Sequence, residues 1–203
     1  MRIIKSLVIL LFCLIPLSAR SQTICDVYQI GKIFSVSIPS TMTIRDPNSI
    51  AGKFIDNRIK KFALEYLDYT ADWKYTFIPS GENSANKYAR IIIYVSRQNN
   101  ITQKMVKEAT MSDLLEVKAA RMKEAKQIGM DVKNFSVSKE IYGGKYAVVL
   151  RYDRAGLSGD VHVEDYMFYL LNKQIEVTIS YRISESRFWK QDFTKIPSTF
   201  YFE

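Results

Sequence analysis

The chain is poor in the side chains that usually bind metals or form disulfides. Among 203 residues it has one histidine, His162, and two cysteines, Cys13 and Cys25. Cys13 lies inside an N-terminal apolar run, so a chain that loses this run keeps one thiol and cannot form an internal disulfide. A structural zinc site needs about four ligands. We therefore expect no metal and no cofactor. We expect Cys25 to be small, inert and partly buried, with an intermolecular bridge as the alternative.

The apolar run at the N-terminus is too short to cross a membrane. It extends from Ser6 to Leu17, roughly 12 residues, whereas a transmembrane helix needs about 20. Arg2 and Lys5 flank its start, and Ala19-Arg20-Ser21 follows it as a small-x-small sequence that a signal peptidase can cleave. We interpret residues 1–21 as a secretory signal peptide, which predicts a periplasmic or extracellular protein. An uncleaved N-terminal anchor is the alternative.

Cys25 does not fit the position of a lipid anchor. A lipoprotein signal has small residues directly before the cysteine and directly after the apolar core. Here Gln22, Thr23 and Ile24 precede the cysteine. We therefore expect no lipid and no stable membrane anchor on the mature chain.

Long basic runs are absent, although the whole chain has a formal net charge of +8. Three of its positive charges, Arg2, Lys5 and Arg20, lie in the predicted signal peptide, and without them the net charge falls to +5. The mixed-charge segment 118–126, with Glu116 just before it, has the pattern of a solvent-exposed helix face. An exported and mildly basic protein of this kind is not expected to bind nucleic acid.

No repeat or Pro/Gly-rich linker divides residues 22–203, which predicts one domain of ordinary size. Apolar–polar alternation and turn signals predict strands over residues 33–38, 42–45, 75–78, 88–96, 132–142, 145–154, 161–171 and 174–183. The apolar run 91–95 predicts a strand that is buried on both faces. The resulting class is α+β, with a mainly antiparallel sheet and helices packed against it.

Three segments have the spacing of helices. Residues 50–67 are the first, and residues 184–196 close the chain with an inward stripe of Phe188, Trp189, Phe193 and Ile196. The middle helix starts at Thr110, which can form a capping box with Asp113, and it stops at Gly129. Its predicted inward stripe is Leu114, Leu115, Met122, Ala125 and Ile128.

Two tight turns predict the pairing of the last four strands. Gly143-Gly144 accepts the positive φ angles of a two-residue hairpin turn, which places Ile141 opposite Tyr146 and Val137 opposite Leu150. In the second hairpin, a turn at Asn172-Lys173 places His162 opposite Ile183.

Catalytic signatures are also lacking. The chain has no G-x-S-x-G sequence, and the glycines of 156–159 lie between two predicted strands rather than before a helix. His162 stands near Asp160 and Glu164 on alternate positions of one strand, which could form an acid–base or metal cluster. A carboxylate-based hydrolase around His162 is therefore the alternative function.

The order of elements and several local sequences resemble the PsbP-like fold, which PsbP shares with DcrB-like periplasmic proteins. The sequences that carry the resemblance are "FSVSIP" near the start, "YGGKYAVVLRY" after the middle helix, and the ending "NKQIEVTISYRISESRFWKQDFTKIPSTFYF". The chain departs from the family in lacking a tryptophan just after the opening proline. The resemblance implies an α/β/α-type sandwich domain and a non-enzymatic accessory or binding protein.

One face of the last two hairpins is the candidate binding site. The predicted register gathers a mixture of basic, acidic, aromatic and apolar side chains there: Arg151, Asp165, Met167, Tyr169, Glu176, Thr178 and Arg182. Such a mixture suits a small ligand or a partner protein of unknown identity. A solvated face, or one covered by the first helix, is the alternative.

Overall fold

The computed structural model describes residues 24–45, 71–81, 87–97, 100–170 and 172–203. The predicted signal peptide and the predicted helix 50–67 lie outside these residues, and the single-domain division stays a prediction. The strands are β1 (Cys25–Ile30), β2 (Phe34–Pro39), β3 (Met42–Ile44), β4 (Ala71–Pro79), β5 (Ala89–Arg97), β6 (Val132–Tyr142), β7 (Lys145–Arg154), β8 (Val161–Leu170), β9 (Lys173–Arg182) and β10 (Tyr201–Phe202). The helices are α2 (Gln103–Glu108), α3 (Met111–Gln127) and α4 (Ser186–Phe193), with 3-10 turns at Ile183–Glu185 and Ile196–Thr199.

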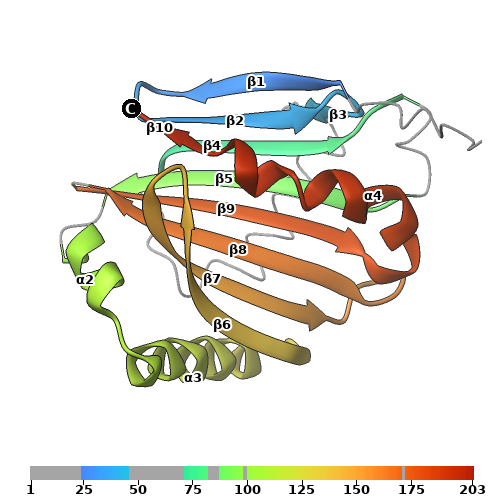
Figure 1. Ribbon diagram of the computed structural model, residues 1–203. Helices are drawn as coiled ribbons and strands as arrows, with labels where there is room; N and C mark the ends of the chain where they lie inside the picture. Colours follow the sequence, from blue (N-terminus) through green and yellow to red (C-terminus); the bar gives the residue numbers. More distant parts are fainter. Residues whose placement is uncertain (1–23, 46–70, 82–86, 98–99, 171) are drawn as a thin grey trace, which may run out of the picture.

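The strands form two antiparallel sheets (Figure 1). The large sheet has seven strands in the order β3-β4-β5-β9-β8-β7-β6, and the small sheet has the order β1-β2-β10. This arrangement confirms the predicted α+β class with a mainly antiparallel sheet. None of the helices that the structure describes has the length and apolar composition needed to cross a bilayer.

The two faces of the large sheet bury different clusters. On one face, which we call the core face, β5, β7, β8 and β9 pack against the small sheet and α4. The members of this cluster include Phe34, Ile93, Val149, Tyr166, Phe168, Val177 and Trp189. On the other face, which we call the α3 face, Leu150 and Met167 pack against Val106 of α2 and Leu114 of α3. The small sheet and α4 therefore cover one face of the large sheet, and α2 and α3 cover the other.

The β6–β7 hairpin has the predicted bounds and register. Ile141 pairs with Tyr146 and Val137 with Leu150. Gly143 and Gly144 have φ angles of +53° and +73°, which L-amino acids with side chains rarely adopt. The pairing becomes irregular between Lys133 and Ser136, and the bulge there adds twist near the open end of the hairpin.

The β8–β9 hairpin differs from its prediction by two residues. The strands close at Leu170 and Lys173, so His162 pairs with Tyr181 and not with Ile183. A shift of two residues keeps every side chain on its predicted face because the period of a strand is two. Ile183 itself begins the following 3-10 turn and is exposed.

Helix α3 has the predicted start and a narrower buried stripe. Asp113 N–H donates to Thr110 Oγ1 at 3.3 Å, and Thr110 N–H donates to Asp113 Oδ2 at 2.7 Å. This capping box is confirmed. Leu114 and Ala125 are buried, whereas Leu115 and Met122 are exposed, so their predicted inward positions are wrong.

Other differences arise where packing, rather than the local sequence pattern, decides exposure. In β5, Ile91 and Val95 are fully buried but Ile92 and Tyr94 are only half-buried, so the strand is not buried on both faces. Phe188 was expected to pack inward and is exposed. Cys25 is exposed at the start of β1, a strand that the pattern did not predict.

Candidate ligand-binding face

Six of the seven candidate binding residues lie on the α3 face of the large sheet. β8 supplies Asp165, Met167 and Tyr169, and β9 supplies Glu176, Thr178 and Arg182. Cross-strand pairing places Asp165 opposite Thr178 and Met167 opposite Glu176. The predicted grouping of these six residues therefore matches the observed register.

Arg151 is the exception, because it lies on the core face. It pairs with Glu164 of β8, and its neighbour Leu150 occupies the α3 face. The prediction failed because residues 147–150 of β7 are buried on both faces. A polar side chain at the end of such a run gives no indication of which face it joins.

Three side chains of the α3 face are also less exposed to solvent than predicted. Met167 is 2% exposed, Asp165 is 8% exposed and Tyr169 is 9% exposed. Met167 and Tyr169 pack in a cluster with Val106 of α2 and Leu114 of α3, and Asp165 lies opposite Leu150 of the same cluster. Glu176 and Thr178 are half-buried and remain in contact with solvent.

Asp165 is the most unusual group on this face. Its Oδ2 accepts a hydrogen bond from Tyr152 Oη at 3.2 Å. Its Oδ1 is buried and has no partner in hydrogen-bond geometry among the described residues, although the Thr178 hydroxyl on the neighbouring strand favours the charged form of this carboxylate. A buried carboxylate oxygen without a hydrogen bond destabilises the fold. A ligand that donates a hydrogen bond to this oxygen would remove that cost.

Glu176 makes this position a pair of carboxylates. Burial raises the pKa of Glu176 to about 7, and the charge of Asp165 contributes to the shift. Burial also raises the pKa of Asp165. Two neighbouring carboxylates, one buried and one half-buried, disfavour double ionisation, so the pair holds a proton near neutral pH more readily than free side chains do.

Arg121 is the nearby cation. It extends from α3, where Nη2 contacts Met167 Sδ at 3.6 Å and Nη1 bonds Glu124 Oε2 at 3.2 Å. Desolvation by itself would lower the pKa of Arg121, but the acidic charges of Glu176, Glu124 and Asp165 raise it. One guanidinium therefore faces more than one carboxylate, and the site can accept a further hydrogen-bond donor or positive group.

The core face has a separate polar network around Arg151. Its Nη1 and Nη2 bond the two oxygens of Glu140 at 2.5 and 3.0 Å, and its Nε bonds Glu164 Oε2 at 3.3 Å. The hydroxyls of Tyr142 and Tyr166 donate to Glu140 and Glu164, respectively. The Arg151 hydrogen bond lowers the pKa of Glu140 to about 2. These charges are compensated within the network.

His162 lies at the edge of the same network. Its Nδ1 is 2.7 Å from Asp153 Oδ1, and its Nε2 is 3.4 Å from Glu164 Oε1. The contact with Glu164, followed by that with Asp153, raises the pKa of His162. Both ring nitrogens therefore face carboxylates, an arrangement that favours the protonated imidazolium. Asp160, the predicted third member, forms an ion pair with Lys133 at 3.8 Å.

No metal-binding group of three or more histidine, cysteine or acidic side chains occurs in the described parts of the chain.

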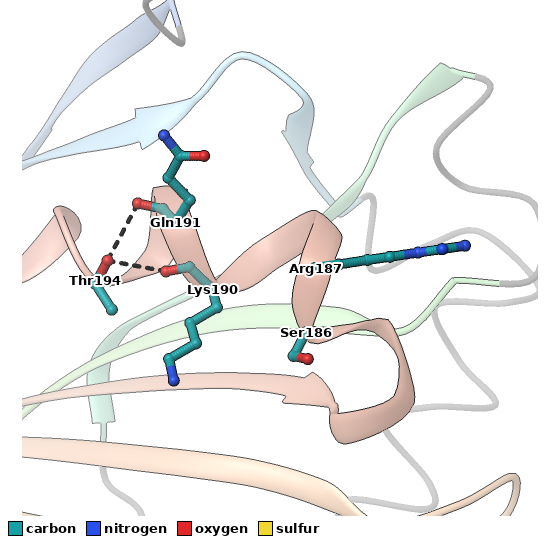
Figure 2. A pocket seen from close by; sticks show the side chains of 5 residues that line it. All are labelled: Ser186, Arg187, Lys190, Gln191 and Thr194. Carbon is teal, nitrogen blue, oxygen red and sulfur yellow. Dashed lines mark hydrogen bonds between the residues drawn. The ribbon is translucent and has the colours of Figure 1, made fainter. Parts of the chain in front are cut away.

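A shallow hollow lies on the outer surface of α4, lined by Ser186, Arg187, Lys190, Gln191 and Thr194. Figure 2 shows that the long side chains there point in different directions. The Thr194 hydroxyl bonds the carbonyls of Lys190 and Gln191. Nothing in the hollow converges on a common point.

Comparison with known proteins was informative for structure only. No family model and no curated protein sequence match the chain. Among solved structures, cyanobacterial PsbP (CyanoP) from Synechocystis sp. PCC 6803 is similar over 88% of this chain and 92% of that one, with a TM-score of 0.57 and 12% identity. The fold is PsbP-like. LpqN, a protein involved in cell envelope biogenesis of Mycobacterium tuberculosis, is similar over 91% of this chain and 93% of that one, with a TM-score of 0.50 and 10% identity.

The PsbP-like fold confirms the resemblance that the sequence indicated. At 10–12% identity these similarities concern the arrangement of strands and helices. One fold can serve many functions, so the function of this chain depends on its own side chains.

Proposed function

We propose that the chain is an exported, non-catalytic accessory protein that binds a ligand or a partner protein through the α3 face. The site consists of Asp165 and Glu176, with Met167, Tyr169 and Thr178 near them. Arg182 lies farther along β9, where it forms an ion pair with Glu185. The observation that carries the proposal is the buried Asp165 oxygen without a partner beside a half-buried second carboxylate. These groups suit a ligand that supplies a hydrogen-bond donor, such as an ammonium or hydroxyl group.

Export is supported by the N-terminal sequence and is consistent with the fold. Residues 1–21 have the basic start, short apolar core and small-residue exit of a signal peptide. A PsbP-like fold also occurs in a protein involved in cell envelope biogenesis. We place the mature protein in the periplasm or outside the cell.

A non-catalytic role is supported by the state of the one histidine. A general base needs a free nitrogen and a neutral ring at the working pH. His162 has carboxylates at both ring nitrogens and a raised pKa. The adjacent Arg151 is engaged with Glu140 and Glu164, so it contributes to structure.

The hydrolase remains the second candidate because the 2.7 Å contact between His162 and Asp153 resembles a histidine–carboxylate dyad. Mature protein and its His162→Ala variant can be screened against glycan, ester and peptide substrates. The accessory role predicts no turnover by either protein. Turnover that His162→Ala abolishes would favour the hydrolase instead.

The binding proposal is tested with native protein recovered from its own cell envelope. Tagged wild type, Asp165→Asn and Glu176→Gln are purified, and the bound small molecules or proteins are identified by mass spectrometry. A component that accompanies wild type should be reduced in both variants. Glu140→Gln is the matched control, because this carboxylate lies in the network of the core face. Equal recovery with all four proteins would show that the α3 face is not the site.

A further inference from the structure

Strand β6 is an outer strand of the large sheet. Among the strands that the structure describes, it pairs with β7 alone, so its other edge has no partner strand there. In a hairpin closed by Gly143-Gly144, Tyr142 and Lys145 exchange hydrogen bonds, so alternate residues direct N–H and C=O groups outward. These residues are Val137, Lys139 and Ile141. Over the described chain, no backbone hydrogen bond reaches their outward groups.

Helix α3 carries an exposed apolar stripe. Met111 is 66% exposed, Leu115 is 53% exposed and Met122 is 44% exposed. At about 100° per residue, these three side chains lie within roughly 40° of one another around the helix axis. Exposed methionine adapts its shape to different partners, and it is common on surfaces that bind peptides.

The stripe lies on the flank of α3 that is next to the β6 edge. Lys118 is within about 60° of each stripe residue around the axis, and its Nζ bonds the Phe135 carbonyl of β6 at 2.7 Å. Lys139 of β6 bonds the Ala109 carbonyl, just before α3, at 2.8 Å. The helix therefore runs antiparallel to β6 and lies beside the first part of the strand, which then rises away from the helix in Figure 1.

We propose that the β6 edge and the Met111–Leu115–Met122 stripe together bind an extended peptide by strand addition. The peptide backbone bonds the outward groups of Val137, Lys139 and Ile141. Every second side chain of the peptide faces the α3 stripe, since side chains alternate along a strand. This interface is separate from the Asp165–Glu176 pair and goes beyond the function proposed above.

The charges of this surface specify an acidic peptide. The charged residues on the same flank of α3 are Lys118 and Lys126, and Lys139 stands in the middle of the exposed edge. Lys118 and Lys139 bond neutral carbonyl groups rather than carboxylates, and the charge of Lys139 also lowers the pKa of Asp113. A peptide with apolar side chains at alternate positions and carboxylates between them complements this surface.

The same charges argue against a second copy of the chain as the occupant. Antiparallel pairing of two β6 strands about a twofold axis centred near Lys139 would bring the two Lys139 side chains together. Like charges at opposite positions destabilise a strand pair. A lysine in an edge strand is also a common protection against self-association.

The test uses mature protein and a labelled nonapeptide that alternates glutamate and valine. Two control peptides have lysine in place of glutamate, or proline in place of the two central valines. Fluorescence anisotropy measures affinity, and amide hydrogen exchange measures protection in β6. We expect saturable binding of the glutamate peptide, at least about tenfold weaker binding of both controls, and slower exchange at Val137, Lys139 and Ile141.

Two pairs of variants separate strand addition from nonspecific attraction. Lys139→Pro removes the outward N–H, and Lys139→Gln is its control because both lose the ammonium group. Leu115→Glu puts an acid into the stripe and lowers the net charge by one unit. Lys123→Glu puts an acid on another side of α3 and lowers the net charge by two units, so a purely electrostatic effect would be larger in the control. We expect affinity to fall about tenfold more in the first member of each pair than in its control.

Three results would overturn the proposal. The first is a glutamate peptide that fails to bind or binds no better than the lysine peptide. The second is binding that leaves β6 amide exchange unchanged. The third is a dimer of the free protein that Lys139→Pro dissociates, which would make a second copy the occupant. If Lys139→Pro does not fold, the Leu115→Glu and Lys123→Glu pair decides.

Discussion

At the scale of single residues, two groups of carboxylates show how environment sets ionisation. Glu140 has the fork of Arg151 on its two oxygens, and its pKa is about 2. Glu176 is half-buried near a second acid, Asp165, and its pKa is about 7. At neutral pH the glutamate on the core face is therefore ionised, whereas the glutamate on the α3 face is partly protonated. Opposite effects of pH on stability follow from this difference.

Glu176→Gln should reduce the decrease in the free energy of unfolding that wild type shows between pH 5 and pH 8. The folded pKa of about 7 exceeds the ordinary 4.5, so the folded state binds more protons than the unfolded state between these values. The free energy of unfolding contributed by this group is full below about pH 4.5 and falls as the pH rises through 7. Urea unfolding at pH 5 and pH 8 should show a smaller decrease for the variant than for wild type. Glu116→Gln, a change of an exposed acid on α3, is the control, and an unchanged decrease in Glu176→Gln would contradict the prediction.

Arg151→Ala should destabilise the fold by about 2 kcal/mol, because it leaves Glu140 and Glu164 half-buried without their cation. Urea unfolding at pH 7 measures this change. Adding Glu140→Gln to Arg151→Ala should recover part of the loss, since one of the unpaired charges is removed. Lys190→Ala, at an exposed position of α4, should change stability by no more than about 0.5 kcal/mol. A loss for Arg151→Ala as small as that control would show that the network contributes nothing.

The network also predicts acid sensitivity. The pKa of Glu140 is lowered to about 2 in the folded state, so its contribution is full above about pH 4.5 and is lost as the pH falls toward 2. A series of unfolding curves between pH 5 and pH 2.5 should show a steeper fall for wild type than for Glu140→Gln. Parallel curves for the two proteins would refute this assignment.

At the scale of elements, local sequence and tertiary contact contributed different information. The β6–β7 hairpin and the α3 capping box were predictable, because both depend on residues close in sequence. Leu115 and Met122 were misassigned because a helix buries only the side chains over which a neighbour packs. The two-residue error at His162 arose because the β8–β9 turn has no glycine pair to mark its position.

The two glycines of the β6–β7 turn should differ in their tolerance of a side chain. A Cβ at Gly143 would lie 2.4 Å from the Phe200 carbonyl oxygen, whereas a Cβ at Gly144 would meet nothing within 4 Å. Gly144→Ala should therefore cost about 1–2 kcal/mol from its positive φ alone. Gly143→Ala should cost more, because the turn and the chain before β10 must also separate. Equal losses in thermal or urea unfolding would show that the contact with Phe200 is unimportant.

At the scale of the whole molecule, the arrangement is a seven-stranded sheet with α2 and α3 on one face and α4 with a small sheet on the other. This arrangement separates two polar regions. The core face holds a compensated network, and the α3 face holds a carboxylate pair with an unpartnered oxygen. Their positions on opposite faces imply that changes in one should leave the other functionally intact.

The proposed signal peptide predicts a defined mature protein. Cleavage after Ser21 leaves a chain of 182 residues that begins with Gln22. Intact-mass measurement of protein recovered from the native cell should give this product. Replacing Ala19 with arginine should impair cleavage, since signal peptidases require small residues near the site. Recovery of full-length wild type would instead support an N-terminal anchor.

The amino-acid sequence by itself determined the α+β class, the principal strands, the capped start of α3 and the glycine turn, because alternation and turn chemistry act over a few residues. It also indicated the PsbP-like fold and the six candidate residues of β8 and β9 that share a face. Only the tertiary structure decided that Arg151 belongs to the opposite face, that Asp165 is buried, and that Met111 and Leu115 stay exposed on α3. Those outcomes depend on which distant segments pack together. The pattern of polar and apolar residues along one segment does not reveal which other segment covers it.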